Sequence, residues 1–372
     1  MNFSPQQERA LKAVEEWLRS SEQVFRLFGY AGTGKTTLAR HVGADHYAAF
    51  TGKAAYVMRE KGCAGATTIH NLIYLPREKS KLRLQALLDE LVKDPDNLDL
   101  QRRVSEERAA LKRPSFTLNT DSELRHSRLL VIDECSMVDE TIGRDLLSFG
   151  CKILVLGDPA QLPPVYGGGY FTQAEPNVLL TEVHRQARDN PILDLATFVR
   201  ERRSLPEAHP LIQHEYFATP EMLIGVEQLI VGRNATRRAL NVRMRELRGY
   251  ESPLPVRGDK VVCTRNNHEL RILNGAVYEV TDVVEETLLE LDSELVVAVH
   301  PEPFLGEEVD VWRLRDAEMF DYGYALTCHK AQGSQWDSVG IIDESAAFRE
   351  HRIRWLYTAI TRAARTLWMI TP

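Results

Sequence analysis

The sequence predicts an α/β protein of two domains, each built on a parallel sheet, and three observations support this prediction. First, the glycine-rich segment Gly29–Thr36 lies between a short apolar run and a helical one. Second, apolar runs with polar residues at or just after their ends follow at Leu129–Glu134 and Lys152–Leu156, as buried parallel strands do. Third, a strand-to-helix pattern starts again at Leu229–Asn234. We also expect a helical insertion in the first domain and a small β-barrel inserted in the second.

The composition is that of a globular chain without a strong charge bias. Its 372 residues are 44% hydrophobic, which allows two or three domains with proper cores. The net charge of −7 means that any site for a polyanion must be a local groove. There is no signal peptide and no long apolar run, so we expect a soluble, cytoplasmic protein with no membrane partner. The cysteines are odd in number and form no C-x-x-C pair, so we expect a reducing compartment and no zinc: Cys63, Cys135, Cys151, Cys263 and Cys328.

The segment Gly29–Thr36 fits the pattern G-x-x-x-x-G-K-[ST] of a phosphate-binding loop. Val24–Phe28 before it is typical of a short buried strand, and Thr37–Val42 after it of a helix. Backbone N–H groups of the loop and the helix N-terminus would hold a triphosphate. We expect Lys35 to bridge the outer phosphates and the Thr36 hydroxyl to bind Mg²⁺. The loop residues predicted to contact the nucleotide are Gly32, Thr33, Gly34, Lys35, Thr36 and Thr37.

An amphipathic helix is predicted over Met1–Ser21, with Ser4 as its cap and Pro5 at its first position. Gln7 has two readings of equal weight. It lies three residues after Ser4, which is the capping-box position. A glutamine just before a phosphate loop can instead recognise adenine through its amide.

Polar residues at the ends of the next strands and helices are candidates for contacts with a phosphodiester backbone, although ordinary capping explains them equally well. In the first domain these residues are Thr51, Lys53, Thr68 and His70. Residues 77–113 are rich in charge and break at Asp94-Pro95-Asp96, which predicts a helical hairpin. This hairpin is a solvated excursion or a guide for a nucleic acid strand.

The apolar strand Leu129–Asp133 ends in two carboxylates, which indicates hydrolysis rather than binding alone. We expect Asp133 to hold magnesium, and Glu134 to orient and deprotonate the attacking water. Two prolines follow Gln161 at the end of the next strand and hold it at the carboxyl edge of the sheet, where it can sense the γ-phosphate.

Two arginines are predicted to reach the triphosphate from the second domain. Arg185 lies in Leu180–Gln186, ahead of a helix that is expected to run through Phe198. Arg362 follows a helical turn near the end of the chain. Such arginine fingers are worth about 10³–10⁵ in rate.

The second domain is expected to start with a strand at Leu229 and a basic helix over Ala235–Leu247. Short alternating strands over 258–311, with Asn274-Gly275 as a hairpin turn, predict the inserted β-barrel. The chain then returns to the second sheet through a strand at Val339–Asp343 and ends with a strand at Thr366–Ile370. Candidates for contacts with a single strand in this part are Thr327, His329 and Ser334, while Gln332 and Gly333 are candidates to face the nucleotide.

The ordered set of motifs resembles superfamily 1B helicases of the RecD-like and phage Dda-like kind. The matching segments run nearly end to end: GYAGTGKTT, FTGKAA, ATTIH, VIDECSMVD, LGDPAQLPPV, LTEVHRQ, LTCHKAQGSQWD and LYTAITRA. This resemblance implies γ-phosphate sensing by Gln161 and finger roles for Arg185 and Arg362. Two features depart from the family pattern. Gln335 stands where the family usually has Glu, and the region of the strand-separating β-hairpin is mostly helical here, with Phe116 as a candidate separating aromatic.

The resemblance implies two RecA-like P-loop domains, at 1–180 with a helical insertion at about 77–125, and at 181–372 with an SH3-like insertion at about 258–318. It implies ATP and Mg²⁺ in the cleft between the domains. It also implies a monomer that moves 5′ to 3′ on single-stranded DNA, acts at single/double-strand junctions, and works with replication or recombination proteins.

Three functions stay open at this point. The chain is an ATP-driven DNA helicase, an ATP-gated loader that grips single-stranded DNA without unwinding, or the helicase subunit of a RecD-type recombination nuclease. Stimulation of ATP hydrolysis by DNA, unwinding of a tailed duplex and co-purifying proteins distinguish them.

Overall fold

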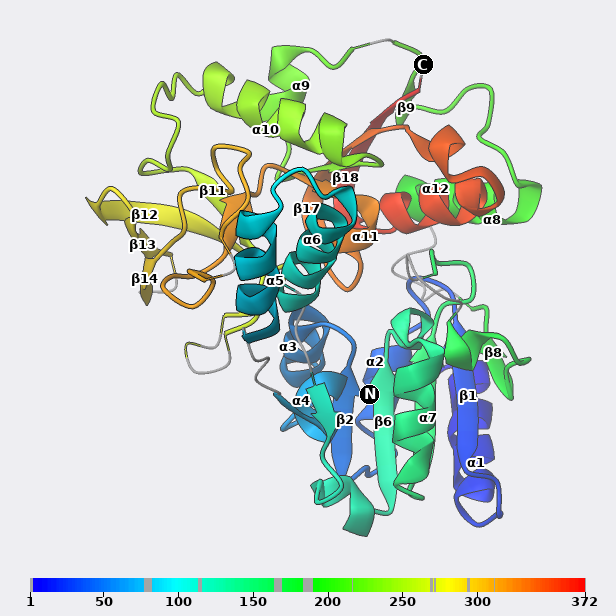
Figure 1. Cartoon of the computed structure of the whole chain (residues 1–372). Coiled ribbons are helices and arrows are strands. Elements are labelled where there is room, and N and C mark those ends of the chain that lie inside the picture. Colours follow the sequence, from blue (N-terminus) through cyan, green and yellow to red (C-terminus); the bar gives the residue numbers. More distant parts are fainter. Residues whose placement is uncertain are drawn as a thin grey trace.

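The computed structural model describes residues 3–76, 82–112, 116–163, 169–182, 190–215, 217–267, 270, 272–292, 295–310 and 312–371. Most of their strands form two parallel sheets that lie in separate lobes, one below the other in Figure 1, and a third, antiparallel sheet beside the second; two short strands form a separate ribbon. The predicted α/β class is therefore confirmed.

The first lobe is built on a six-stranded parallel sheet in the order β3-β2-β6-β7-β1-β8. Its strands are β1 Val24–Gly29, β2 His46–Ala49, β3 Thr67–Thr68, β6 Leu129–Asp133, β7 Lys152–Gly157 and β8 Val178–Leu180. Parallel strands are covered on both faces, so the central ones are almost wholly apolar, and every residue of β6 is buried. The phosphate loop follows β1, which pairs with β7 and β8.

Helices cover both faces of this sheet. One core joins the sheet to α1 Pro5–Leu18, α2 Lys35–Ala39 and α3 Gly52–Glu60, and the other joins it to α4 Ile69–Ile73 and α7 Glu140–Ser148. Ser4 caps α1 and Pro5 starts it, as predicted. The helix after the loop was predicted at Thr37–Val42 but starts at Lys35, because Gly34 takes a left-handed conformation that lets the loop turn directly into the helix.

The interval between α4 and β6 contains strands that the sequence did not indicate. β4 Tyr74–Pro76 pairs with β5 Phe116–Leu118 in an antiparallel ribbon. The helices predicted for this interval lie between the two strands, as α5 Leu82–Lys93 and α6 Leu98–Lys112. Leu84, Leu87 and Val104 form a small core between them, against which Leu314 of the antiparallel sheet region also packs.

The second lobe is built on a five-stranded parallel sheet in the order β16-β10-β17-β18-β9. Its strands are β9 Ile212–Gln213, β10 Gln228–Val231, β16 Ala325–Thr327, β17 Trp336–Ile342 and β18 Ala363–Ile370. Its helices are α8 Pro191–Arg202, α9 Pro220–Ile224, α10 Asn234–Leu247, α11 Cys328–Ala331 and α12 Arg352–Ile360. The chain also has short 3₁₀ segments: η1 Glu123–His126, η2 Cys135–Met137, η3 Tyr170–Thr172 and η5 Ser345–His351.

The third sheet has the antiparallel order β14-β13-β12-β11-β15. Its strands are β11 Lys260–Cys263, β12 Val277–Glu285, β13 Leu288–Leu291, β14 Leu295–Ala298 and β15 Phe320–Tyr322. The expected barrel is incompletely closed, because in the described residues the edges meet only through an isolated bridge, Val299 to Glu318. This sheet shares a core with α10 through Met244 and Val261. Within the described part of the chain, no helix has the length and apolar character needed to cross a membrane.

Candidate nucleotide-binding site

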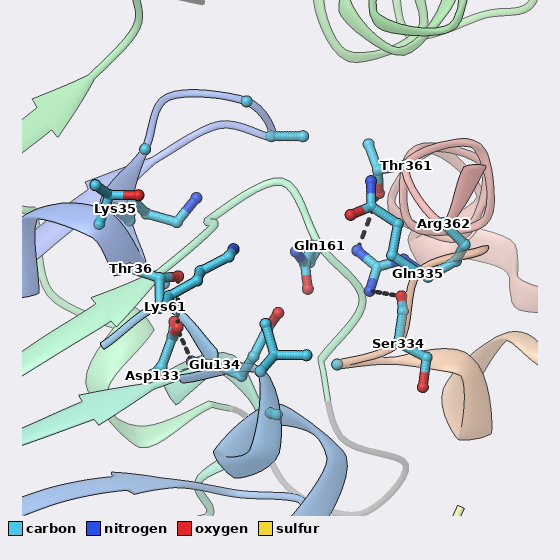
Figure 2. A pocket seen from close by; sticks show the side chains of 18 of the residues that line it. Lys35, Thr36, Lys61, Asp133, Glu134, Gln161, Ser334, Gln335, Thr361 and Arg362 are labelled. Atoms are coloured by element: carbon cyan, nitrogen blue, oxygen red, sulfur yellow. Dashed lines mark hydrogen bonds between the residues drawn. The ribbon is translucent and has the colours of Figure 1, made fainter. Parts of the chain in front are cut away.

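The two lobes face each other across a cleft of about 950 Å³. Figure 2 shows side chains from both lobes pointing into it, with Lys35, Thr36 and Glu134 on one side and Arg362 on the other. The predicted residues that line it are Gln7, Gly32, Gly34, Lys35, Thr36, Thr37, Lys53, Asp133, Glu134, Gln161, Gly333, Ser334 and Arg362. The structure therefore brings together residues that are up to 355 positions apart, from Gln7 to Arg362 (362 minus 7).

The phosphate loop has the geometry of an anion cradle. Gly32 and Gly34 have φ values of 78° and 79°, which side chains rarely adopt. The Lys35 ammonium donates to the carbonyls of Gly29 and Tyr30 at 2.6 and 3.1 Å, so it is held at the loop. The Thr33 hydroxyl donates to the Tyr30 carbonyl at 2.8 Å, and Thr33 is only 1% exposed. The Thr33 side chain therefore braces the loop and does not line the cleft.

Thr36 and Asp133 fit a magnesium site. The Thr36 hydroxyl donates to Asp133 Oδ2 at 2.8 Å, and the Glu134 N–H donates to Asp133 Oδ1 at 2.8 Å. Mg²⁺ is commonly bound by one or two carboxylates together with substrate phosphates and waters. A hydroxyl and a carboxylate in contact beside a phosphate cradle supply the protein's share of such a site. Bound there, the ion would neutralise charge on the phosphate oxygens.

Glu134 has the position and electrostatics of a general base. It follows β6 in a left-handed conformation, with φ of 54°, which is unusual for a side-chain-bearing residue and turns the chain sharply at the strand end. Burial and the neighbouring charge of Asp133 raise the pKa of the Glu134 carboxyl, while Arg362 and Lys35 oppose this rise. A raised pKa brings the group nearer to the value at which it can accept a proton from water.

We expect this shift to appear in the pH dependence of ATP hydrolysis. A base is active when deprotonated, so a raised pKa of Glu134 moves the acid-side loss of kcat to a pH above the ordinary glutamate value of 4.5. The measurement is kcat against pH, with circular dichroism at each pH to exclude unfolding. A folded enzyme that keeps full kcat down to the ordinary value contradicts this assignment.

Gln161 and Gln7 approach the cleft in different ways. Gln161 is 7% exposed, and its Oε1 has no hydrogen-bond partner among the described residues, which leaves it available to a water in the cleft. Gln7 forms the capping box through Oε1, which accepts from Ser4 N–H at 3.1 Å, and its Nε2 donates to the Thr33 carbonyl at 3.1 Å. The capping reading of Gln7 is thus correct, and the same amide also supports the phosphate loop.

Arg362 is 6% exposed and is held in place by its own lobe. It donates to the carbonyls of Thr358 and Ser334 at 3.0 Å each, and to the Thr361 hydroxyl at 3.2 Å. Its charge opposes the rise in the pKa of the Glu134 carboxyl that burial and Asp133 cause, so Arg362 lies within electrostatic reach of the first lobe. The other predicted finger, Arg185, lies outside the described residues.

The predicted nucleic-acid residues fall into separate groups. The hydroxyls of Thr51, Thr68 and Thr327 each accept an N–H from the first turn of a helix, so ordinary capping is present at all three. A Cβ on Gly333 would lie 2.8 Å from the Thr51 hydroxyl, which places Thr51 at the boundary between the lobes. Lys53 lies over the Trp336 ring at 4.6 Å, also across that boundary.

The two predicted histidines lie in aromatic surroundings. His70 contacts the rings of Phe50, Tyr74 and Phe116, with centroid distances of 5.9, 5.5 and 5.2 Å. His329 faces Phe348 at 5.8 Å, and burial lowers its pKa. Ser334 is 4% exposed and lines the nucleotide cleft. Contacts of these residues with DNA stay a prediction.

Sequence reasoning missed several residues at the cleft. Lys61 follows α3 and points into it (Figure 2), and no motif marks this position. Tyr357 and Asp158 hydrogen-bond to each other across the lobes at 2.7 Å. Both lie inside motifs that were recognised, five residues before Arg362 and three before Gln161. Polar side chains within these largely apolar segments were the signal that could have identified them.

The fold and the site together define a class of P-loop protein whose cleft is lined by two α/β lobes. Two family models match: an AAA domain over residues 2–215 and a UvrD-like helicase C-terminal domain over residues 322–370. The chain belongs to the family of the AAA domain, whose model covers more than half of it.

The chain is also similar in sequence to proteins of known name. The ATP-dependent RecD2 DNA helicase of Deinococcus radiodurans is 31% identical over 280 residues, which cover 63% of this chain and 35% of that protein. The RecD subunit of the Mycobacterium tuberculosis RecBCD enzyme is 25% identical over 93% of this chain and 66% of its own. The chain thus spans about a third of the first relative and just under two thirds of the second.

Solved structures share the fold. Pif1 helicase from a study of unwinding at forked double-stranded DNA superposes with a TM-score of 0.60 at 17% identity, over 100% of this chain and 95% of that one. Bacteroides Pif1 bound to single-stranded DNA superposes with a TM-score of 0.58 at 18% identity and the same coverage. The RecA-like architecture of both lobes follows from these likenesses.

Proposed function

We propose that this chain is an ATP-driven helicase that translocates on single-stranded DNA, 5′ to 3′, and unwinds duplexes at single/double-strand junctions. The observation that carries this proposal is the cleft, where Lys35 and Glu134 of one lobe face Arg362 of the other. A nucleotide held by both lobes draws them together, and its hydrolysis removes the shared contacts. Names of the relatives support DNA as the track.

In this proposal the roles within the cleft are divided between the lobes. Lys35 and the loop amides hold the phosphates, Thr36 and Asp133 hold Mg²⁺, and Glu134 takes a proton from the attacking water. Gln161 senses the γ-phosphate through the same water. Arg362, joined by Arg185, stabilises the charge that develops on the transferred phosphoryl group, so hydrolysis requires a closed cleft.

We further propose that the motor consists of domains 1–180 and 181–372. The antiparallel sheet within about 258–318 is then the SH3-like insertion, and α5 and α6 belong to the insertion of the first domain. Thr68 and Thr327 end β3 and β16, which are edge strands of the two parallel sheets, and His70 and His329 lie two residues further on. These four residues are the proposed grips on DNA. If these residues hold DNA through its phosphates, the affinity for DNA should fall as the salt concentration rises.

The test uses forked duplexes that carry only a 5′ or only a 3′ single-stranded tail. We expect single-stranded DNA to stimulate ATP hydrolysis strongly, and only the 5′-tailed duplex to be unwound. Hydrolysis that ignores DNA refutes the proposal. Stimulated hydrolysis without unwinding favours a loader, and a nuclease that co-purifies from the native source favours a RecD-type subunit, which the second relative would suit.

Phe116 on the β4–β5 ribbon is the proposed separating aromatic. It is 43% exposed, and the rings of His70 and Tyr74 support it at centroid distances of 5.2 and 6.0 Å. We expect Phe116→Ala to reduce unwinding about tenfold or more, since a stacked base is worth about 1–3 kcal/mol, and to leave DNA-stimulated ATP hydrolysis intact. Phe217, which is 84% exposed, provides the control: Phe217→Ala should change neither rate. Equal unwinding by both variants moves the separating role elsewhere.

A further inference from the structure

A tyrosine of the second lobe hydrogen-bonds directly to the phosphate loop. The Tyr357 hydroxyl on α12 accepts the backbone N–H of Ala31 at 3.0 Å and donates to Asp158 Oδ2 at 2.7 Å. Both Tyr357 and Asp158 are 2% exposed. One hydroxyl therefore joins the loop after β1, the loop after β7 and a helix of the opposite lobe, with its donor and an acceptor position both used.

Neighbouring contacts strengthen this junction. The Arg200 guanidinium of α8 lies over the Tyr30 ring at 3.5 Å, so the second lobe contacts two consecutive residues of the phosphate loop. The first-lobe residue Leu162 donates its N–H to the Thr358 hydroxyl at 2.8 Å, and its carbonyl accepts from Gln332 Nε2 at 2.7 Å. Leu162 is also buried in the core of the second lobe.

The junction is rigidly connected to the predicted arginine finger. Arg362 Nε donates to the carbonyl of Thr358, the residue next to Tyr357, at 3.0 Å. A shift of Tyr357 relative to Ala31 therefore shifts the anchor of Arg362 relative to the loop that would hold the phosphates. Since α12 is a helix packed in a dense core, we expect Tyr357 and the Thr358 carbonyl that anchors Arg362 to move as one unit.

The protonation states of the two groups favour the hydrogen bond between Tyr357 and Asp158. Burial raises the pKa of the Tyr357 hydroxyl well above its ordinary value, so this group stays protonated and remains a donor. Burial also raises the pKa of Asp158, against the lowering effects of Lys35 and of the Tyr357 hydrogen bond. Without the Tyr357 hydroxyl, the buried Asp158 carboxylate would lose a hydrogen-bond donor, and an unsatisfied buried acceptor costs free energy of folding. This cost favours the pairing of these two groups.

We propose that Tyr357, oriented by Asp158, is a positioning residue that fixes the distance between the phosphate loop and Arg362. A change in the conformation of the phosphate loop is then transmitted to the second lobe through protein contacts as well as through the shared nucleotide. This inference deepens the proposed function and rests on it for ATP as the substrate. The Tyr357 hydroxyl touches no reacting atom and acts through the placement of Arg362.

The test compares Tyr357→Phe with a matched control in the same lobe. Tyr324 is also buried, and its hydroxyl donates to a buried aspartate, Asp259, at 2.8 Å, away from the phosphate loop. Tyr324→Phe therefore removes an equivalent hydroxyl. In hydrogen–deuterium exchange on the nucleotide-free chain, we expect the phosphate-loop peptide to exchange faster in Tyr357→Phe and to be unchanged in Tyr324→Phe.

The kinetic part of the test asks whether the effect passes through Arg362. We expect Tyr357→Phe to lower DNA-stimulated kcat about tenfold, equivalent to about 1.4 kcal/mol, with the KM for ATP unchanged. In an Arg362→Lys background, the same substitution should cost little more, because coupled residues are not additive. Unchanged loop exchange, an equal loss of kcat in Tyr324→Phe, or full additivity overturns the inference. Failure of the proposed function would appear differently, as a wild-type chain without DNA-stimulated hydrolysis, and the exchange result would still be readable.

Discussion

Arg362→Ala should lower DNA-stimulated ATP hydrolysis by about 10³–10⁵, the effect of losing an arginine finger. The physical reason is that no other described cation of the second lobe lines the cleft, apart from this guanidinium. Binding of ATP should change little, because Lys35 and the loop amides are untouched. Measurement of kcat and of ATP affinity in the same variant separates the two effects.

Lysine is the informative comparison at this position. Arg362→Lys keeps a positive charge but cannot make the planar, forked set of bonds that now reaches Thr358, Ser334 and Thr361. We expect an intermediate rate. A loss of only a few-fold in Arg362→Ala would reduce this residue to a structural role in its own lobe.

Glu134→Gln should lower hydrolysis by about 10²–10⁴, which is the usual contribution of a positioned general base. The substitution is nearly isosteric, so Mg²⁺ and ATP should still bind. With hydrolysis blocked, the variant should accumulate ATP-bound protein that holds single-stranded DNA tightly. Filter binding of labelled ATP, together with DNA affinity in the presence of ATP, measures both consequences.

Glu140 provides the control for that variant. It lies exposed at the start of α7 and pairs with Arg144, so Glu140→Gln should hydrolyse ATP at the wild-type rate. Normal turnover in Glu134→Gln would show that another group accepts the proton.

Much of the first lobe could be predicted because local signals and tertiary demands agree there. The β6 strand is apolar because it is buried on both faces, and its carboxylates follow at the sheet edge where the phosphate loop lies. The same agreement made Ser4 and Pro5 readable as a helix start. Gly34 marked the phosphate loop but not the early start of α2. Glycine adopts right-handed and left-handed backbone conformations with similar ease, so the sequence did not show which one Gly34 takes.

Other features depend on contacts between distant segments, which no local pattern encodes. The β4–β5 ribbon was missed because each strand has only three residues, separated by two helices. Lys61 reaches the cleft only because α3 ends beside it. Gln7 received two readings of equal weight: the structure shows that its amide forms the cap and also contacts the phosphate loop, while recognition of adenine stays a prediction.

The central claim is that both lobes together form the binding site of one ATP. The most direct test is a structure of the chain with Mg²⁺, ADP, a fluoroaluminate and a short single-stranded DNA. We expect Arg362 to leave the Ser334 carbonyl, to which it now donates at 3.0 Å, and to place a guanidinium N–H within about 3 Å of the fluoroaluminate. A closed complex in which Arg362 stays on Ser334 and only first-lobe residues contact the fluoroaluminate would contradict this claim.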